Sequence, residues 1–200
     1  MNKPFSQACE NNKQPILQVL ANVFSNTKHV LEIGSGTGQH AAFFGQHLPT
    51  LTWQTSDLSI NHQGINLWLD ESACSNVKRP VVIDLNETWF MPHNKLPIDG
   101  LYTANTLHII SWPLVVKFFD GIAQNLESQA YVCIYGPFNY QGKFTSESNA
   151  NFDLWLKERD INSGIRDIEA ILSLANSAGL NLIDDHAMPA NNRLLVFSKI

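Results

Sequence analysis

The chain has 200 residues, and a hydrophobic fraction of 44% with a charged fraction of 16% allows a packed core and excludes a disordered chain. Its formal net charge is -5 and it has no cluster of Lys or Arg, so non-specific binding of nucleic acid is not expected. The N-terminal stretch is polar and no apolar run approaches the ~20 residues of a membrane span, so we expect one cytoplasmic domain over residues 1–200.

Hydrophobic periodicity and turn residues predict alternating helices and strands in the first half of the chain. The first helix is expected between Pro15 and Ser25, with Pro15 in its first turn. The next elements are a strand over 29–33, a glycine turn with a helix that ends before Pro49, a strand over 51–55, a helix over 60–70, a strand over 81–83 that Pro80 opens, and a loop over 86–95.

The second half of the chain continues this alternation up to its last two strands. We expect a strand over 100–104, a helix over 113–126 and a strand over 130–135. A long segment over 138–164 with a short helix over 152–159 comes next, followed by a helix over 165–178 and strands over 180–184 and 194–198.

The order of these elements indicates the fold class. Strands that are continuous apolar runs and alternate with helices are typical of a parallel sheet covered on both faces. The last two strands are joined only by a turn, so one of them should run antiparallel to its neighbour. The pattern predicts a single α/β domain with an open, mostly parallel sheet.

The segment from Val30 to His40 joins an apolar strand to the start of a helix through three glycines at alternate positions. Such a turn lets the backbone N–H groups of a helix N-terminus approach a ligand closely. A dinucleotide fingerprint would place its third glycine where Gln39 stands. With Glu32 in the preceding strand, the spacing instead resembles motif I of the class I S-adenosylmethionine (SAM) methyltransferases. A purely structural glycine turn is the alternative.

Polar side chains follow three of the predicted strands, at the edge where open α/β sheets bind ligands. Asp57 lies nineteen residues after the third glycine, an interval typical of a carboxylate that binds ribose hydroxyls. Asp84 matches the adenine-binding acid of the methyltransferase pattern. For these two acids the alternatives are a helix cap and a turn residue. Asn105 is expected to position the methyl donor or acceptor, although the amino-methylating Asp/Asn-Pro-Pro-Tyr/Phe pattern is absent.

Two side chains are candidates for catalysis. His108 is a candidate general base because its ordinary pKa lies near neutrality, and packing at a pocket wall is the alternative. Tyr135 ends the fifth strand on the same side by topology. The segment over 138–164 is rich in aromatic residues and long enough for a lid or binding surface. It predicts an aromatic acceptor pocket formed by Phe138, Tyr140, Phe144, Phe152 and Trp155, whereas a self-packed surface excursion is the alternative. Arg159, Arg166, Asn191 and Asn192 are candidates to pair with an anionic acceptor, and structural pairs with Asp153 and Asp167 are the alternative.

Glu32 interrupts an apolar strand, and a buried carboxylate needs partners. The resemblance to the class I methyltransferases implies that it orders the glycine turn or meets the ammonium group of SAM, and a purely structural role is the alternative. Cys9, Cys74 and Cys133 form no C-x-x-C pair and no histidines have metal-ligand spacing, so no metal site is predicted.

The sequence resembles the methyltransferase-like protein 26 family, also called domain of unknown function 938. The resemblance runs from about Pro4 to the C-terminus and rests on the segments GTGQH, YGPF, SNxxFD and MPANN. The family usually reads Arg-Asn where this chain has Glu10-Asn11, so one cationic contact near the cofactor is in doubt. The resemblance implies the seven-stranded Rossmann-like class I fold, and a SAM site formed by Glu32, Gly34, Ser35, Gly36, Gly38, Asp57, Asp84, Leu85 and Asn105. It also implies acceptor contacts by Phe138, Asn139, Ser148, Asn149, Phe152 and Asp153.

These observations predict a SAM-dependent methyltransferase with a small-molecule acceptor. Methyl transfer is an in-line displacement in which alignment and exclusion of water supply much of the catalysis. The alternative is a non-catalytic protein that binds SAM or S-adenosylhomocysteine (SAH) and acts through protein partners. A nicotinamide-dependent oxidoreductase is a third hypothesis, disfavoured by the early third glycine and the lack of a Tyr-x-x-x-Lys pair. The sequence indicates neither the acceptor nor the oligomeric state.

Overall fold

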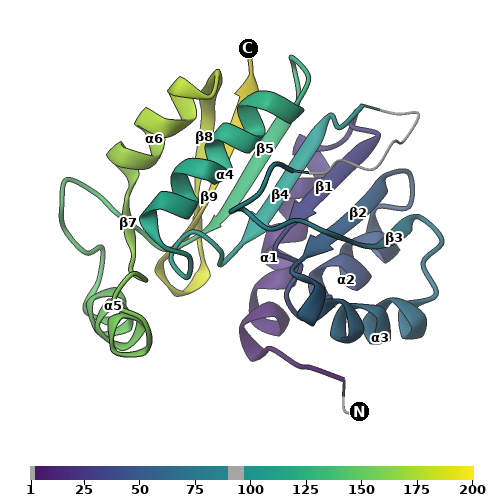
Figure 1. The fold of residues 1–200 in the computed structure, drawn as a ribbon, viewed down its shortest axis with the longest axis horizontal. Coiled ribbons are helices and arrows are strands. Elements are labelled where there is room, and N and C mark those ends of the chain that lie inside the picture. Colours follow the sequence, from purple (N-terminus) through teal and green to yellow (C-terminus); the bar gives the residue numbers. More distant parts are fainter. Residues whose placement is uncertain (1–2, 90–96) are drawn as a thin grey trace.

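The computed structural model describes residues 3–89 and 97–200, so most of the predicted loop over 86–95 lies outside the described residues. The main sheet has seven strands in the order β3-β2-β1-β4-β5-β9-β8 (Figure 1). They are β1 (His29–Ile33), β2 (Thr52–Asp57), β3 (Val77–Val82), β4 (Gly100–Ala104), β5 (Tyr131–Gly136), β8 (Leu180–Met188) and β9 (Asn192–Lys199). The pairs from β3 to β5 are parallel, and β9 is antiparallel to both β5 and β8. The predicted sheet and its antiparallel C-terminal strand are therefore confirmed.

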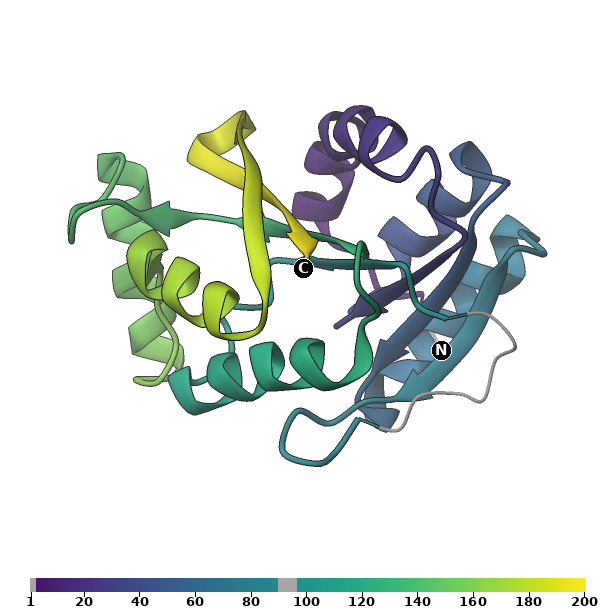
Figure 2. The same ribbon diagram turned by 90° about the horizontal axis from the view of Figure 1, so that it is seen from above.

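Helices cover both faces of this sheet. Helices α1, α2 and α3 lie on one face, and α4 and α6 lie on the other (Figure 2). No helix of the described ranges is long and apolar enough to cross a membrane. The helices are α1 (Gln7–Val23), α2 (Gln39–His47), α3 (His62–Ser72), α4 (Trp112–Asn125), α5 (Glu147–Arg159) and α6 (Ile168–Ser177), with short 3-10 turns η1 (Ser59–Asn61) and η2 (Pro189–Asn191).

The core consists of two apolar layers because side chains alternate between the two faces of each strand. In β1, Leu31 and Ile33 pack with side chains of α4 and α6, whereas Val30 packs with side chains of α1 and α2. Trp53 and Tyr102 are fully buried in the second layer. The glycine turn that follows β1 is thus anchored at the end of a strand that is buried on both faces.

Helix α1 begins at Gln7, eight residues before the predicted start, and Pro15 lies inside it. The earlier start has two causes. The Ser6 hydroxyl caps the helix by accepting a hydrogen bond from the Cys9 N–H at 3.4 Å. The Ser6 N–H in turn donates to Gln39 Oε1 at 2.5 Å, which fixes the first turn of α1 against α2. These contacts outweigh the helix-breaking effect of the proline.

Two further boundaries differ from the prediction. Strand β3 begins at Val77, and Pro80 lies within it rather than opening it. Because β3 is an edge strand with a register irregularity at this point, a residue without an N–H group is tolerated. Helix α5 begins at Glu147 rather than at 152, because the Ser146 hydroxyl caps it by accepting from the Asn149 N–H at 3.1 Å.

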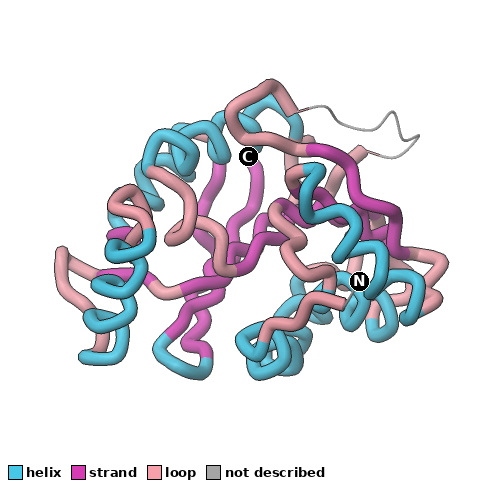
Figure 3. Tube along the Cα trace, turned by 60° about the horizontal axis from the view of Figure 1, so that its bottom comes forward, coloured by secondary structure: helices cyan, strands magenta, loops and turns pink. Residues whose placement is uncertain are grey.

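A second, two-stranded sheet forms after β5. Strand β6 (Phe138–Asn139) pairs in parallel with β7 (Arg166–Asp167), which is why α6 begins at Ile168 instead of 165. Helix α5 lies between these strands in sequence and reaches the carboxyl edge of the main sheet. Figure 3 brings this edge forward, with the N-terminal segment and α5 on its two sides.

Candidate functional site

The glycine turn is built from backbone conformations that side chains disfavour. Gly34, Gly36 and Gly38 have φ of 72°, 56° and 88°. A Cβ at Gly34 would lie 3.0 Å from Thr106 Oγ1, and one at Gly38 would lie 2.9 Å from Ile65 Cα. A Cβ at Gly36 would meet nothing within 4 Å. The backbone at Gly36 is therefore open to a ligand, whereas Gly34 and Gly38 are enclosed by protein.

The carboxylate of Asp57, at the end of β2, ties this turn to the sheet. Asp57 Oδ2 accepts a hydrogen bond from the Gly36 N–H at 2.7 Å. Its Oδ1 accepts from the Leu58 N–H and from Asn61 Nδ2, both at 2.7 Å. A carboxylate offers about four lone-pair positions, so roughly one remains for a ligand.

Glu32 lies behind the turn, and it lines neither of the two pockets described below. Its Oε2 accepts hydrogen bonds from Ser35 Oγ at 2.8 Å and from Trp53 Nε1 at 3.1 Å. Burial raises the pKa of Glu32 to about 7, against the opposing effect of these two donors. Because Ser35 Oγ also accepts from the Ser56 N–H at 3.1 Å, Glu32 orders the glycine turn from beneath.

Two pockets meet at the carboxyl edge of the sheet, and both are lined by Gly34, Thr106 and Ile110. The smaller has a volume of about 220 Å³ and holds the strand-end acids. Its other lining residues are Ile33, Asp57, Leu58, Ile83, Asp84, Leu85, Asn86 and Leu114. The larger has a volume of about 500 Å³ and lies between α1, the glycine turn, the loop after β4 and α5.

The loop after β4 brings two predicted residues to the larger pocket. Asn105 and His108 both line it, and Asn105 has a left-handed conformation with φ of 56°. The His108 ring is buried and meets the Phe152 ring edge-on, with 5.4 Å between centroids. Burial, and secondarily the positive charge of Arg166, lowers the pKa of His108 to about 4. His108 is therefore a neutral imidazole at neutral pH.

Backbone carbonyls of this loop are held by the segment that follows α5. The Gly164 N–H donates to the His108 carbonyl at 2.9 Å, and Ser163 Oγ donates to the Ile109 carbonyl at 2.6 Å. Arg166 donates from Nε to the Leu107 carbonyl at 3.0 Å and from Nη2 to the Ile110 carbonyl at 2.5 Å. The residues that follow α5 thus fix the loop after β4, which forms one wall of the larger pocket.

A buried polar network lies under the opposite wall. His40 lines the larger pocket, and its Nε2 lies 2.7 Å from Asn12 Oδ1 of α1. Its Nδ1 lies 3.3 Å from the Tyr102 hydroxyl of β4. Burial lowers the pKa of His40 to about 4, so this ring is also neutral at neutral pH. Ser6 and Cys9 were not candidates, because the predicted first helix began only at Pro15. His40 was not a candidate either, although it lies in the segment GTGQH that carries the family resemblance.

Three candidates from β5 and β6 line neither pocket. Tyr135 is buried on the α1 side of the sheet, where its hydroxyl interacts with Asn12 and Asn192 and burial raises its pKa. Phe138 packs in the apolar layer of α4 and α6. Asn139 is buried, and its Oδ1 has no hydrogen-bond partner in the described part of the chain.

The polar candidates of α5 also lie outside the pockets, while Phe152 lines the larger one. Ser148 Oγ and the Asn149 side chain form hydrogen bonds with Asn191 of η2 at 3.1 and 3.2 Å. Asp153 Oδ1 accepts from the Ile165 N–H at 2.7 Å, and its Oδ2 pairs with Lys157. These contacts connect α5 to the rest of the fold.

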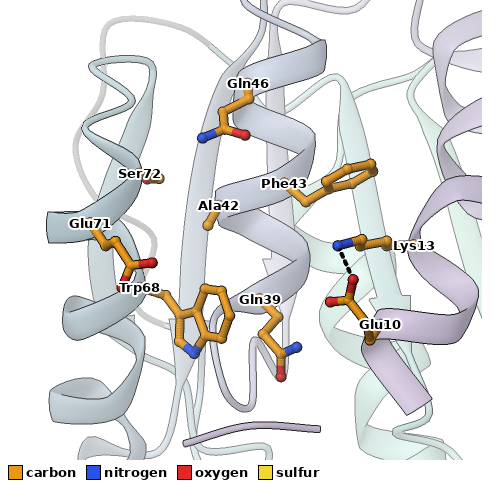
Figure 4. A pocket seen from close by; sticks show the side chains of 9 residues that line it. All are labelled: Glu10, Lys13, Gln39, Ala42, Phe43, Gln46, Trp68, Glu71 and Ser72. Atoms are coloured by element: carbon orange, nitrogen blue, oxygen red, sulfur yellow. Dashed lines mark hydrogen bonds and ion pairs between the residues drawn. The ribbon is translucent and has the colours of Figure 1, made fainter. Parts of the chain in front are cut away.

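A third pocket of about 170 Å³ lies among α1, α2 and α3 (Figure 4). Glu10, which stands where the resembled family usually has Arg, lines this pocket and forms an ion pair with Lys13. None of the predicted site residues lines it. The strand-end acids and the open Gly36 backbone therefore favour the two joined pockets as the functional site.

The fold, with a glycine turn at the carboxyl ends of parallel strands, is that of the Rossmann-like methyltransferases. NcsB1, an O-methyltransferase from neocarzinostatin biosynthesis solved with SAM and 2-hydroxy-5-methyl naphthoic acid, aligns with a TM-score of 0.78 and 15% identity over 96% of this chain and 55% of its own. An O-methyltransferase family protein from Burkholderia thailandensis aligns with a TM-score of 0.77 and 16% identity over 94% and 56%. PigF, solved with SAH, aligns with a TM-score of 0.74 and 16% identity over 93% and 61%.

At these identities the similarity defines the fold, and the chain spans less than two thirds of each of these structures. The sequence itself defines the family. Residues 3–199 match the proteins of unknown function DUF938, and the chain belongs to this family. The predicted membership in the domain of unknown function 938 family is confirmed, and the name methyltransferase-like protein 26 stays a prediction.

Proposed function

We propose that this protein is a SAM-dependent methyltransferase that acts on a small-molecule acceptor. The observation that carries the proposal is the junction of the two pockets at Gly34, Thr106 and Ile110, beside the open Gly36 backbone. A small acidic pocket next to a larger one suits a cofactor whose reactive end faces a second ligand. Proteins of this fold solved with SAM, with SAH or with apigenin support the proposal.

The residues of the smaller pocket fit the adenosine part of SAM. Asp57 has about one acceptor position left, which suits a ribose hydroxyl. Asp84 is held by the Asn86 N–H, which donates to its Oδ1 at 2.8 Å, and its carboxylate suits the adenine amino group. Ile83 and Leu85 supply apolar surface for a purine ring. The open backbone of Gly36 leaves room for the methionine arm at the larger pocket.

The chain's own part in the reaction is to hold two ligands in line and to exclude water. When bound, SAM supplies an electrophilic methyl group. His108 is neutral and, with a pKa of about 4, a weak base, so it suits an acceptor that is already ionised or readily loses its proton. Asn105 lines the same pocket as His108, and its amide suits a role in orienting the acceptor. Alignment by these residues supplies the main rate acceleration.

The first test is calorimetric titration of the purified protein with SAM and SAH, with NAD as the control ligand. We expect micromolar or tighter affinity for SAM and SAH and no binding of NAD. A folded protein that binds neither SAM nor SAH contradicts the proposal. Cofactor binding without methyl transfer to any acceptor supports the non-catalytic alternative.

Asp57→Asn tests the ribose assignment. The variant keeps the shape of the side chain but loses the charge, so we expect SAH affinity to fall by roughly tenfold or more, the worth of a charge-assisted hydrogen bond. Because Asp57 also accepts from the Gly36 N–H, the melting temperature is measured alongside. Asp70→Asn is the matched control, since Asp70 is exposed and pairs with Arg79 on the surface. Unchanged SAH affinity in Asp57→Asn rejects the assignment.

A further inference from the structure

The α5 wall of the larger pocket carries stacked aromatic rings with a cation at their end. Phe152 and Trp155 are one helical turn apart, and their rings stack at 20° with 5.7 Å between centroids. Arg159, a further turn along, places its guanidinium carbon 4.6 Å from the centre of the Trp155 ring. All three side chains line the pocket.

Arg159 is the only Lys, Arg, Asp or Glu among the described residues that line this pocket. The two histidines of the lining, His40 and His108, are neutral at neutral pH because burial lowers the pKa of each to about 4. Within the described part of the chain, Arg159 forms no ion pair. The pocket is therefore cationic in a protein whose formal net charge is -5.

Flat aromatic surface and a guanidinium that no carboxylate neutralises together select for a ligand with the complementary features. Phe152 and Trp155 offer edges and faces to a planar ring, and they line a pocket whose remaining wall includes the apolar Ile109 and Ile110. A guanidinium recognises a carboxylate by paired hydrogen bonds. An anionic ligand would also be attracted to a sulfonium held at the adjoining glycine turn.

We propose that the acceptor side of the larger pocket binds a planar aromatic carboxylate, with its ring against Phe152 and Trp155 and its carboxylate on Arg159. The proposal rests on the proposed function, in that the glycine-turn side of the same pocket is left for the cofactor. It names the chemical class of the acceptor, which the family and the structural neighbours leave open for this chain.

The test uses trans-cinnamate and its neutral amide, cinnamamide, which share size and planarity and differ in charge. Their affinities are measured by ligand-observed NMR titration of the intact protein, with and without saturating SAH. We expect cinnamate to bind at least about tenfold more tightly than cinnamamide, as a charge-assisted pair requires. In Arg159→Gln the two affinities should become equal, and in Arg159→Lys part of the preference should return.

Matched variants separate charge recognition from loss of structure. Arg159 is exposed in the last turn of α5, so Arg159→Gln should leave the melting temperature nearly unchanged. Arg79→Gln removes an exposed arginine of β3 that pairs with Asp70 of α3 and lines neither of the two joined pockets, so it should leave the cinnamate preference intact. Trp155→Leu should weaken the binding of both probes, because it removes half of the ring stack.

Two results overturn the proposal. The first is a wild-type protein that binds cinnamate no more tightly than cinnamamide. The second is a fall in SAH affinity in Arg159→Gln, which would assign the guanidinium to the carboxylate of the methionine arm. A wild-type protein that fails to bind SAH contradicts the proposed function instead, and the cinnamate comparison without SAH remains a separate measurement.

Discussion

At the scale of single residues, the three glycines of the turn are required for different reasons. Gly38 has no room for a side chain because the backbone of α3 lies too close. A Cβ at this position would lie 2.9 Å from Ile65 Cα. Gly34 faces the side-chain hydroxyl of Thr106, while Gly36 faces open space. The same sequence motif thus combines a packing requirement at one end with a ligand-facing backbone at its centre.

Alanine substitutions should separate these two requirements. Gly38→Ala combines a left-handed φ with a backbone clash, so we expect it to destabilise the fold by about 3 kcal/mol or more. Gly36→Ala carries only the cost of its left-handed φ, about 1 kcal/mol, but places a methyl group where a ligand would approach. Urea denaturation and SAH calorimetry measure both effects. Equal stability losses in the two variants would refute this division.

The buried Glu32 makes stability depend on pH. Its pKa is about 7 in the folded chain and near 4.5 when unfolded, so between these values the unfolded state binds fewer protons. Stability from this group is therefore full below about pH 4.5 and is lost as the pH rises through about 7. His40 and His108, whose folded pKa values are lowered to about 4, give the opposite slope below about pH 6.5.

Glu32→Gln isolates the contribution of the carboxyl group. Relative to wild type, the variant should gain on the order of 3 kcal/mol in unfolding free energy between about pH 5 and about pH 8, because the glutamine does not ionise. The two histidines are present in both proteins and cancel in the difference. Urea denaturation across this range provides the measurement, and parallel pH profiles for the two proteins would contradict the expectation.

At the scale of elements, α5 and the residues after it are part of the scaffold as well as of the pocket wall. Arg166 donates to the carbonyls of Leu107, Ile110 and Asn162, so β7 is connected to the loop after β4 by one side chain. Together with the hydrogen bonds from Gly164 and Ser163 to the same loop, this connection positions the aromatic face of α5 against His108.

Arg166→Met should remove that connection. A charge-assisted hydrogen bond is worth about 1.5–3 kcal/mol, and two of the three acceptors, the carbonyls of Leu107 and Ile110, lie on one loop and are not independent, so we expect a combined loss of about 3 kcal/mol in unfolding free energy. Arg159→Met is the matched control, since the exposed Arg159 side chain packs on the Trp155 ring and forms no ion pair within the described ranges, so its loss should cost less than about 1 kcal/mol. Similar urea midpoints for the two variants would show that Arg166 does not fix the loop.

At the scale of the whole molecule, the pattern of alternating strands and helices was enough to predict the sheet and its antiparallel strand. Strands β1 and β4 have the predicted bounds, because each is an apolar run between polar turns. The start of α1 could not be read from Pro15, because Ser6 and Gln39 determine it through a contact 33 residues apart in sequence.

The candidate site, like the fold, could be predicted from the sequence only in part. Topology brought Asp57, Asp84, Asn105 and His108 to the joined pockets, because parallel strands end at one edge. Topology does not say which face a strand-end side chain takes. The Tyr135 side chain lies on the α1 face of β5, away from both pockets, because neighbouring residues of a strand alternate. Helices α1 and α5 also form walls of the larger pocket. Their positions depend on helix caps and on contacts between residues far apart in sequence, which local sequence patterns do not reveal.

The position of Ser6 has a practical consequence for anyone who purifies this protein. Ser6 lines the larger pocket, so only five residues would separate a peptide fused at the N-terminus from the binding site. The C-terminal end lies at the opposite edge of the sheet, and Ile200 is 68% exposed (Figure 1). An affinity tag for ligand screening therefore belongs at the C-terminus, where it cannot obstruct or imitate a ligand.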